Sequence, residues 1–338
     1  MIREIGFTDI PGVRTGQAED PEGGTGCTVL LFQNGGRAGC DIRGGGPASR
    51  ETELLRPEKT VEQIHAVVLS GGSAFGLEAA DGVMRYLSEK GIGFDVGIGT
   101  KRVPIVCGAS IFDLGAGSSE AYPDREMGYR ACLNSEKGEE PLSGNHGAGT
   151  GATVGKFSGA GRAMKSGIGF YAAECGKIKI GACACVNALG DVTEHESGRI
   201  LAGLRSADGK NISGSVRKML ESLEKHPQEG RRRSENKGPV QNTTISCIVT
   251  NGKLTKTACT KLAQTAADAY ARSIRPVHSS LDGDSVFFVS AGEEEVSPDV
   301  LSVLSEEILS RAIERSVKEA ESAYGYPAMR DLPSALLK

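Results

Sequence analysis

The chain alternates between short apolar runs and longer amphipathic stretches. The apolar runs are rich in Val, Ile, Leu, Phe and Cys and are bounded by Gly or polar residues, a pattern typical of buried strands. Strands are predicted at 27–32, 65–70, 168–173, 177–187, 243–250 and 285–290, with further short apolar runs at 103–107 and 111–113. No internal repeat relates these runs to one another.

Helices are predicted between the apolar runs. They cover 77–91, 125–133, 212–226, a segment from Thr255 and a last long segment from Pro298. The segment from Thr255 has an apolar face at helical spacing, made of Cys259, Leu262, Ala263, Ala266 and Tyr270. Ser297 before Pro298 is typical of a helix N-cap followed by Pro in the first turn. Because strands and helices alternate, the pattern predicts an α/β layered domain.

The composition and net charge limit the classes of partner that we expect for this domain. The chain has 338 residues, 38% hydrophobic and 24% charged, which is typical of a globular protein with a core. A net charge of −4 gives no electrostatic reason to expect nucleic acid or an anionic membrane as a partner. No apolar run approaches the ~18 residues of a membrane helix, and the first residues lack the apolar core of a signal peptide. We therefore expect a cytoplasmic protein with no nucleic-acid or membrane partner.

The cysteines and histidines show no spacing that indicates a disulfide framework or a metal site. The nine Cys are spread from Cys27 to Cys259 without a CxxC pair, which is typical of reduced thiols. Cys183 and Cys185 alternate along a predicted strand, where core packing is the expected role. The five His form no HExxH or similar pattern, so neither a metal nor a cofactor is predicted.

Glycine is enriched and clustered. The chain has 47 Gly, about twice the average share of ~7%, and the densest cluster spans 144–169. A second cluster, GGSAFG at 71–76, follows a predicted strand and opens a helix. It fits neither GxGxxG nor a P-loop, and a nucleophile elbow would need Gly where Phe75 stands. The cluster is interpreted as a tight turn with Ser73 capping the helix, or as a loop that lines a site.

The junction between Asn242 and Thr243 separates two segments of opposite character. Residues 222–241 contain only Leu223 and Val240 as clear aliphatic residues, together with a basic triplet at 231–233, which predicts an exposed mobile loop. The β-branched strand TTISCIVT follows at once. Asn in a turn and Thr in a strand would explain the junction without chemistry. The setting also suits self-cleavage, because a freed N-terminal α-amine, with a pKa near ~7.7–8.0, can activate the Thr hydroxyl.

Two further local patterns are typical of turns. Asp282-Gly283-Asp284 is explained by a hairpin turn, but two nearby carboxylates can also hold different pKa values and relay protons. Asn251-Gly252, after the strand at 243–250, predicts a turn.

Seven segments, taken in order, resemble the self-processing aminopeptidases that include D-aminopeptidase/D-esterase, β-peptidyl aminopeptidases and the nylon-oligomer (6-aminohexanoate-oligomer) endo-hydrolase branch. They are FTDIPGVRTGQAED, SGGSAFGLEAADGV, EAYPDREMGYRA, GATVGKF, VNALGD, NTTISCIVTN and HSSLDGDSVFFVS. The resemblance spans nearly the whole chain and is strongest for the nylon-hydrolase branch. The segment 191–241 matches none of the family motifs.

The resemblance implies a role for each of several residues. It implies that Thr243 is the nucleophile, exposed by cleavage after Asn242. It implies that Asn187 stabilises an oxyanion, as a side-chain amide can. The same family comparison implies four further site residues: Asp282 and Asp284 as a carboxylate pair, with Tyr122 and Lys156. From the residues alone, Tyr122 is equally explained by packing and Lys156 by a surface charge.

The family also implies an architecture and an activity. It implies an αββα sandwich of the N-terminal-nucleophile-hydrolase type, a single catalytic domain over 1–338, and self-cleavage into chains 1–242 and 243–338. It implies hydrolysis of peptide-like amides through an acyl-enzyme, in a homotetramer whose only other partner is a small peptide or amide substrate. Three alternatives stay open: an acyltransferase of the ornithine-acetyltransferase type, a non-catalytic oligomeric binding protein, and a Ser-His-Asp hydrolase that uses Ser73.

Overall fold

The structure is a computed structural model that describes residues 2–225 and 242–332. The basic triplet and most of the predicted loop before Asn242 lie outside the described residues. Among the described residues, no helix is both long and apolar enough to cross a membrane.

A ten-stranded sheet is folded into two layers because one long strand, β3 (Thr25–Ile42), belongs to both. The C-terminal half of β3 pairs with β17, and its N-terminal half pairs with β2 and β5. The first layer runs in the order β1 (Arg3–Glu4), β11 (Ile168–Cys175), β12 (Ile178–Asn187), β15 (Thr243–Gly252), β17 (Ser285–Glu294), β3. The second layer holds β2 (Arg14–Asp20), β3, β5 (Ile64–Ser70), β8 (Val106–Ser110) and β4 (Ala48–Arg50).

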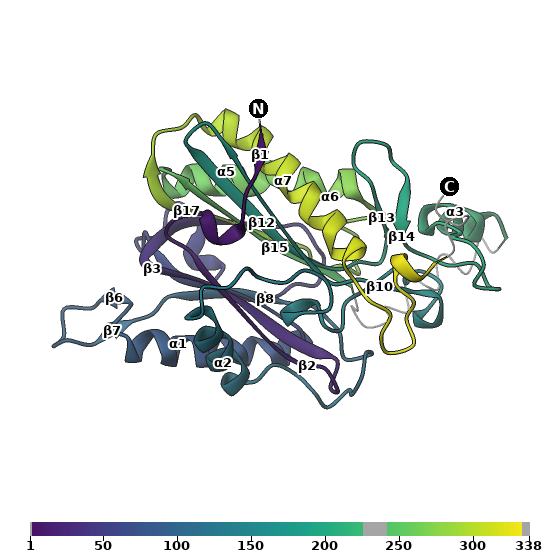
Figure 1. Cartoon of the computed structure of the whole chain (residues 1–338), viewed down its shortest axis with the longest axis horizontal. Helices are drawn as coiled ribbons and strands as arrows, with labels where there is room; N and C mark the ends of the chain where they lie inside the picture. The colour runs from purple at the N-terminus through teal and green to yellow at the C-terminus, as the bar shows by residue number, and fades with distance from the viewer. Residues whose placement is uncertain (1, 226–241, 333–338) are drawn as a thin grey trace.

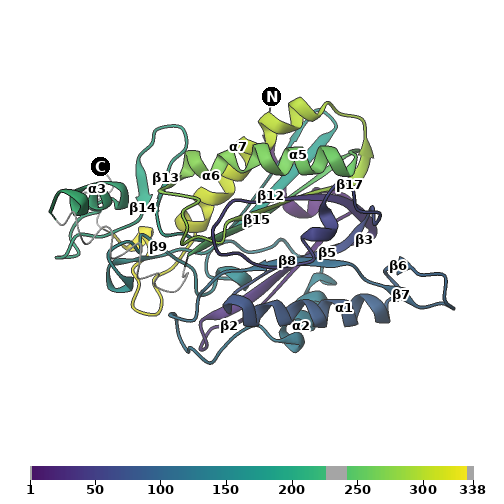
Figure 2. The same cartoon turned by 180° about the vertical axis from the view of Figure 1, so that it is seen from behind.

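Helices cover both outer faces of this double sheet (Figures 1 and 2). On the first layer lie α5 (Lys256–Ala266), α6 (Asp268–Ser273) and α7 (Pro298–Lys318). On the second layer lie α1 (Ala79–Glu89) and α2 (Arg125–Ser135). A further helix, α3 (Ser215–Lys225), lies away from the sheets at one end of the molecule. The order of layers is therefore αββα, as predicted.

The remaining elements are short. They are the strands β6 (Phe94–Asp95), β7 (Arg102–Val103), β9 (Thr153–Val154), β10 (Met164–Lys165), β13 (Asp191–Thr193), β14 (Ile200–Ala202) and β16 (Ile274–Arg275), and the 3-10 turns Phe7–Asp9, Glu53–Leu55, Ser73–Glu78, Gly147–Gly149, Ala160–Arg162 and Met329–Asp331.

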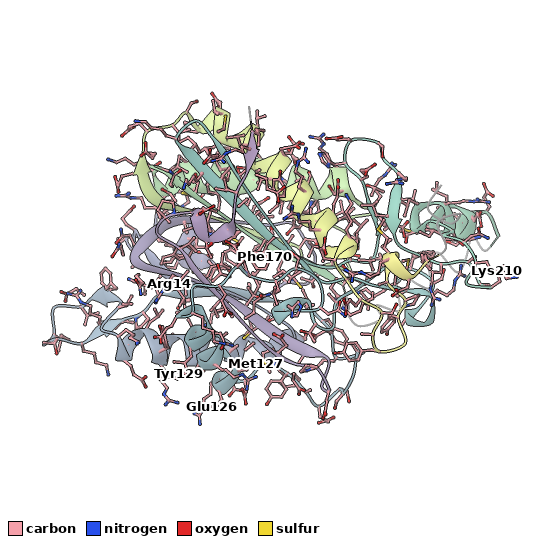
Figure 3. The ribbon with its side chains drawn as sticks, viewed as in Figure 1. Arg14, Glu126, Met127, Tyr129, Phe170 and Lys210 are labelled. Atoms are coloured by element: carbon pink, nitrogen blue, oxygen red, sulfur yellow. The ribbon has the colours of Figure 1, made fainter. Side chains whose placement is uncertain are left out.

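Three apolar cores hold the four layers together. The central core lies between the two sheets and includes Phe170 and Phe287. The second core lies between the first sheet and α5–α7, and the third lies between the second sheet and α1–α2. Figure 3 labels Phe170 in the middle of the molecule and Met127 on α2, in the third core. Cys183 and Cys185 lie in the central core, so their predicted packing role is confirmed.

Most predicted elements are present, and two local predictions were wrong. Asn251 and Gly252 continue β15 instead of turning, because the Asn251 side chain binds the Lys177 carbonyl and the Lys179 N–H across the β11–β12 turn. Ser73 does not cap a helix with its side chain. Its N–H donates to the Ile111 carbonyl at 2.8 Å, and the turn is made by Gly72 in the left-handed region, where glycine has no steric cost.

Candidate active site

Thr243 is the first residue of β15, a strand in the middle of the first sheet. It lies opposite Asn187 in the antiparallel register with β12, and β15 runs parallel to β17 on its other side. The Thr243 side chain is buried, and its hydroxyl donates to the carbonyl oxygen of Asn242 at 2.5 Å. The predicted nucleophile and the bond it would cut are therefore in direct contact.

The backbone before β17 holds the Asn242 carbonyl in place. The Gly283 N–H donates to this carbonyl at 2.9 Å, and the Asn242 side-chain amide donates to the Leu281 carbonyl at 3.3 Å. A Cβ atom on residue 283 would lie 2.8 Å from Thr243 Oγ1, so only glycine fits there without a shift. An N–H aimed at this oxygen polarises the carbonyl and can stabilise negative charge on it.

Asp284 is buried beside the start of β15 and fixes its backbone. Its Oδ1 accepts the Thr244 N–H at 2.7 Å. Its Oδ2 accepts the His278 N–H at 3.1 Å and lies 2.9 Å from His278 Nδ1. This carboxylate connects the residue after the nucleophile to the turn that carries His278.

Asp282 is the second buried carboxylate of the pair, and its Oδ2 accepts the Ser279 N–H at 2.8 Å. Burial, and then the neighbouring charge of Asp284, raise the pKa of Asp282. The two carboxylates thus have different surroundings.

Lys156 and Asn187 form a polar pair at the end of β12. Lys156 Nζ donates to Asn187 Oδ1 at 2.7 Å and to its backbone carbonyl at 2.9 Å. The Asn187 amide Nδ2 donates to the Phe112 carbonyl at 2.8 Å, an interaction that the sequence did not predict. Burial lowers the pKa of Lys156 to about 7, opposed by the charges of Asp282 and Asp113. This lysine can therefore exchange a proton near neutral pH.

Tyr122 lies apart from these residues. Its side chain is 37% exposed, and its ring packs against that of Phe75 with 5.4 Å between centroids. None of the hydrogen bonds within the described residues joins it to Thr243, Asn187 or Lys156. Its Cβ lies close beside Gly72, so Tyr122 packs against the glycine turn at 71–76, in which Phe75 is exposed and the glycines are buried.

Asp113 is a buried carboxylate near this site that the sequence analysis did not identify. It accepts the Gly72 N–H at 2.6 Å and the Thr25 hydroxyl at 2.8 Å. It lines a pocket together with Phe112, Thr153 and Lys156. Burial raises its pKa to about 6. The only local indication was its position in the short apolar run at 111–113, which follows the end of β8.

Comparison with known proteins identifies the family. Residues 6–326 match peptidase family S58. An uncharacterized aminopeptidase of Mycobacterium bovis is 36% identical, over 96% of this chain and 97% of the relative. The 6-aminohexanoate-oligomer endohydrolase of a Kocuria species is 30% identical, over 86% of this chain and 76% of the relative.

A solved structure agrees with the fold. The L-aminopeptidase D-Ala-esterase/amidase of Ochrobactrum anthropi, described as a variant of the Ntn hydrolase fold, superposes with a TM-score of 0.65. The alignment has 17% identity and covers 93% of this chain and 86% of that chain, so the likeness concerns the fold. The match to the family over nearly the whole chain confirms the predicted resemblance: the chain belongs to peptidase family S58 and is a hydrolase of amide bonds.

Proposed function

We propose that the chain cuts itself between Asn242 and Thr243 and then uses Thr243 as an N-terminal nucleophile. The observation that carries the proposal is the contact of the Thr243 hydroxyl with the Asn242 carbonyl, which also accepts the Gly283 N–H. In the first step Thr243 Oγ attacks the carbonyl carbon of Asn242. The C–N bond breaks, the nitrogen takes a proton and becomes the α-amine, and an ester joins the two residues. Water then hydrolyses this ester.

The mature site uses the products of that cut. The Thr243 α-amine, with a pKa near ~7.7–8.0, takes the hydroxyl proton as Oγ attacks the substrate carbonyl. The leaving amine departs protonated, and water releases the acyl group from the Thr243 ester. Asn187 stands opposite Thr243 in the β12–β15 pair, and Lys156 contacts Asn187; both serve as donors to the oxyanion. Asp282 holds the backbone at Ser279, Asp284 holds it at Thr244 and His278, and both carboxylates accept protons near the new amine.

The substrate class follows from the relatives and from the site. Relatives named as aminopeptidases and as 6-aminohexanoate-oligomer endohydrolases act on amide bonds. We propose small peptide-like amides, including ω-amino acid oligomers, as substrates. Tyr122 and Phe75 form an exposed aromatic rim that would contact a substrate beyond the reacting bond. The proposal includes a cytoplasmic location and a homotetramer of cleaved 1–338 protomers.

The test is the mass of the purified protein on a denaturing gel, compared with that of the Thr243→Ala variant. Wild type should give fragments of about 25 and about 10 kDa, in proportion to residue number in a chain of 35.3 kDa, and the smaller should begin Thr-Thr-Ile-Ser. Thr243→Ala should remain one full-length band and lose at least 10³-fold in amide hydrolysis, because no nucleophile is left.

A matched control lies at the next residue. Thr244 is equally buried, and its hydroxyl has no hydrogen-bond partner among the described residues. Thr244→Val should therefore fold, cleave and hydrolyse amides like wild type. A wild-type chain that stays intact after long incubation at several pH values would overturn the proposal, as would full activity in Thr243→Ala.

A further inference from the structure

A second group of polar side chains gathers far from Thr243 in the sequence and on different elements. His195 and Glu196 follow β13, and Glu307 lies on α7. One ligand atom from each of the three lies within 4.8 Å of the others. The His195 side chain is only 3% exposed, whereas Glu196 is largely exposed. The group therefore joins a buried imidazole to two carboxylates near the surface.

A fourth residue, Glu314, fixes the orientation of the imidazole. The buried Glu314 carboxylate contacts His195 Nδ1 and accepts the His195 backbone N–H at 3.0 Å. Lys318 holds the other oxygen of Glu314 at 2.6 Å, which favours the ionised carboxylate. An ionised carboxylate at Nδ1 accepts the proton of that nitrogen, so the lone pair of a neutral imidazole lies on Nε2.

The lone pair on His195 Nε2 faces other acceptors. Nε2 lies 3.3 Å from Glu307 Oε2 and 3.9 Å from Glu196 Oε1. Although it is buried, Nε2 has no hydrogen-bond partner within the described part of the chain. Acceptors that face one another at this distance repel unless a positively charged species lies between them. A buried polar atom without a partner also costs free energy.

We propose that His195 Nε2, Glu307 and Glu196 bind a divalent cation of the Zn²⁺ type. Ligand atoms bound to Zn²⁺ at its usual distances lie about 3.4 Å apart in a tetrahedron, close to the separation of His195 Nε2 and Glu307 Oε2. Glu196 lies on an exposed turn and reaches the ion with a small movement, and water takes the fourth position. The Glu314–His195–cation arrangement is the one in which a carboxylate orients a metal-bound imidazole.

The surrounding charges favour a cation. Three carboxylates (Glu196, Glu307 and Glu314) surround the imidazole and face two cationic side chains. Lys318 pairs with Glu314, and Arg311 contacts both Glu307 Oε1 and, at 3.4 Å, Glu196 Oε1. The three negative charges thus exceed the two positive charges by one. Arg311 contacts Glu307 Oε1 at 2.6 Å and leaves Oε2 directed toward His195. A bound ion would connect the turn after β13 to α7. It would thereby stabilise the segment that follows Asn187, without contact with the reacting atoms.

The test measures Zn²⁺ binding to the untagged full-length protein. After removal of metals with a chelator, we expect dialysis against Zn²⁺ and elemental analysis to give one equivalent per chain, and the melting temperature to rise by several degrees. Glu196→Gln should weaken Zn²⁺ binding at least tenfold and leave the melting temperature of the metal-free protein unchanged, because Glu196 is exposed. Glu307→Gln should abolish the stoichiometric site.

A control lies next to the ligand on α7. Glu306 pairs with Arg272 and does not face His195, so Glu306→Gln should bind Zn²⁺ like wild type. If Glu307→Gln does not fold, Glu196→Gln alone decides the question. Two results would contradict the proposed site: no stoichiometric binding of Zn²⁺, or binding that neither Glu196→Gln nor Glu307→Gln weakens. In either case a proton, and not a metal ion, would lie between His195 and Glu307.

Discussion

At the scale of single residues, the difference between Thr243 and Thr244 shows what singles out the candidate nucleophile. Both are buried threonines at the start of one strand, and residue type alone does not separate them. Only Thr243 has its hydroxyl on the Asn242 carbonyl, and only that carbonyl accepts the Gly283 N–H. The proposed chemistry therefore depends on contacts between 242–243 and 282–284, which the strand pairing brings together.

Gly283 provides a sharp test of this arrangement. We expect Gly283→Ala to slow self-cleavage roughly tenfold or more, because the added methyl would lie 2.8 Å from Thr243 Oγ1 and displace it from the carbonyl. A time course of band intensities after a short pulse of synthesis would measure the rate. Gly161→Ala is the control, because no atom lies within 4 Å of its added Cβ. Cleavage at the wild-type rate in Gly283→Ala would show that this close approach does not matter.

The family motifs supplied the candidate site residues, but no local pattern predicted the contacts that those residues make. The family motifs brought forward Thr243, Asn187, Lys156 and the carboxylate pair, and the structure places them around one strand end. The contact of the Asn187 amide with Phe112 depends on a partner 75 positions away, so no local pattern predicts it. Asp113 was missed for the same reason: its environment comes from the glycine turn and from Thr25, and neither forms a motif with it.

At the scale of elements, hydrophobic periodicity predicted the positions of most strands and helices. The reason is that the burial pattern of an element and the caps of a helix depend on residues that are close together in the sequence. Ser297 caps α7, as its position before Pro298 indicated, and α5 begins after Thr255, which accepts the Ala258 N–H. The full length of β3 was not predicted. Polar and glycine residues interrupt its apolar run after Phe32, while the strand continues through an irregularity between Leu31 and Gly36 into the other layer.

The packing of α1 against α2 rests on two glycines. A Cβ on Gly82 would lie 1.8 Å from the Arg125 carbonyl oxygen, and one on Gly128 would lie 1.9 Å from the Ala79 carbonyl oxygen. Ala is intrinsically the better helix former by ~1 kcal/mol. We nevertheless expect Gly82→Ala to lower the free energy of unfolding by about 1–3 kcal/mol, because the helices must move apart.

Urea denaturation of the Gly82→Ala variant would measure this change. Gly115→Ala serves as the reference, because its added methyl meets no atom within 4 Å. Gly82→Ala should keep self-cleavage, because α1 and α2 cover the outer face of the second sheet, whereas β15 lies in the first sheet. Stability equal to or above that of wild type would show that the two helices do not depend on the glycine contact.

At the scale of the whole molecule, the proposed cut falls between segments that are interleaved in one sheet. The strand order places β15 and β17 side by side, with β12 on one flank and β3 on the other. Residues before the cut thus supply both flanks, and residues after it supply the middle. The sequence predicted the layers but not this order, because strand pairing depends on the global arrangement of the chain.

This topology predicts that the two fragments remain one particle after the cut. β15 pairs with β12 from Ile180 to Asn187, and β17 pairs with β3 from Arg37 to Ile42. Separating the fragments would expose these ladders and the apolar cores on both faces of the sheet, which is unfavourable in water. In gel filtration without denaturant, cleaved wild type and intact Thr243→Ala should elute at the same volume. Denaturant should separate the fragments of wild type alone. Elution of a free fragment of about 10 kDa from native wild type would contradict the strand order, since a chain held from both sides cannot leave without unfolding the sheet.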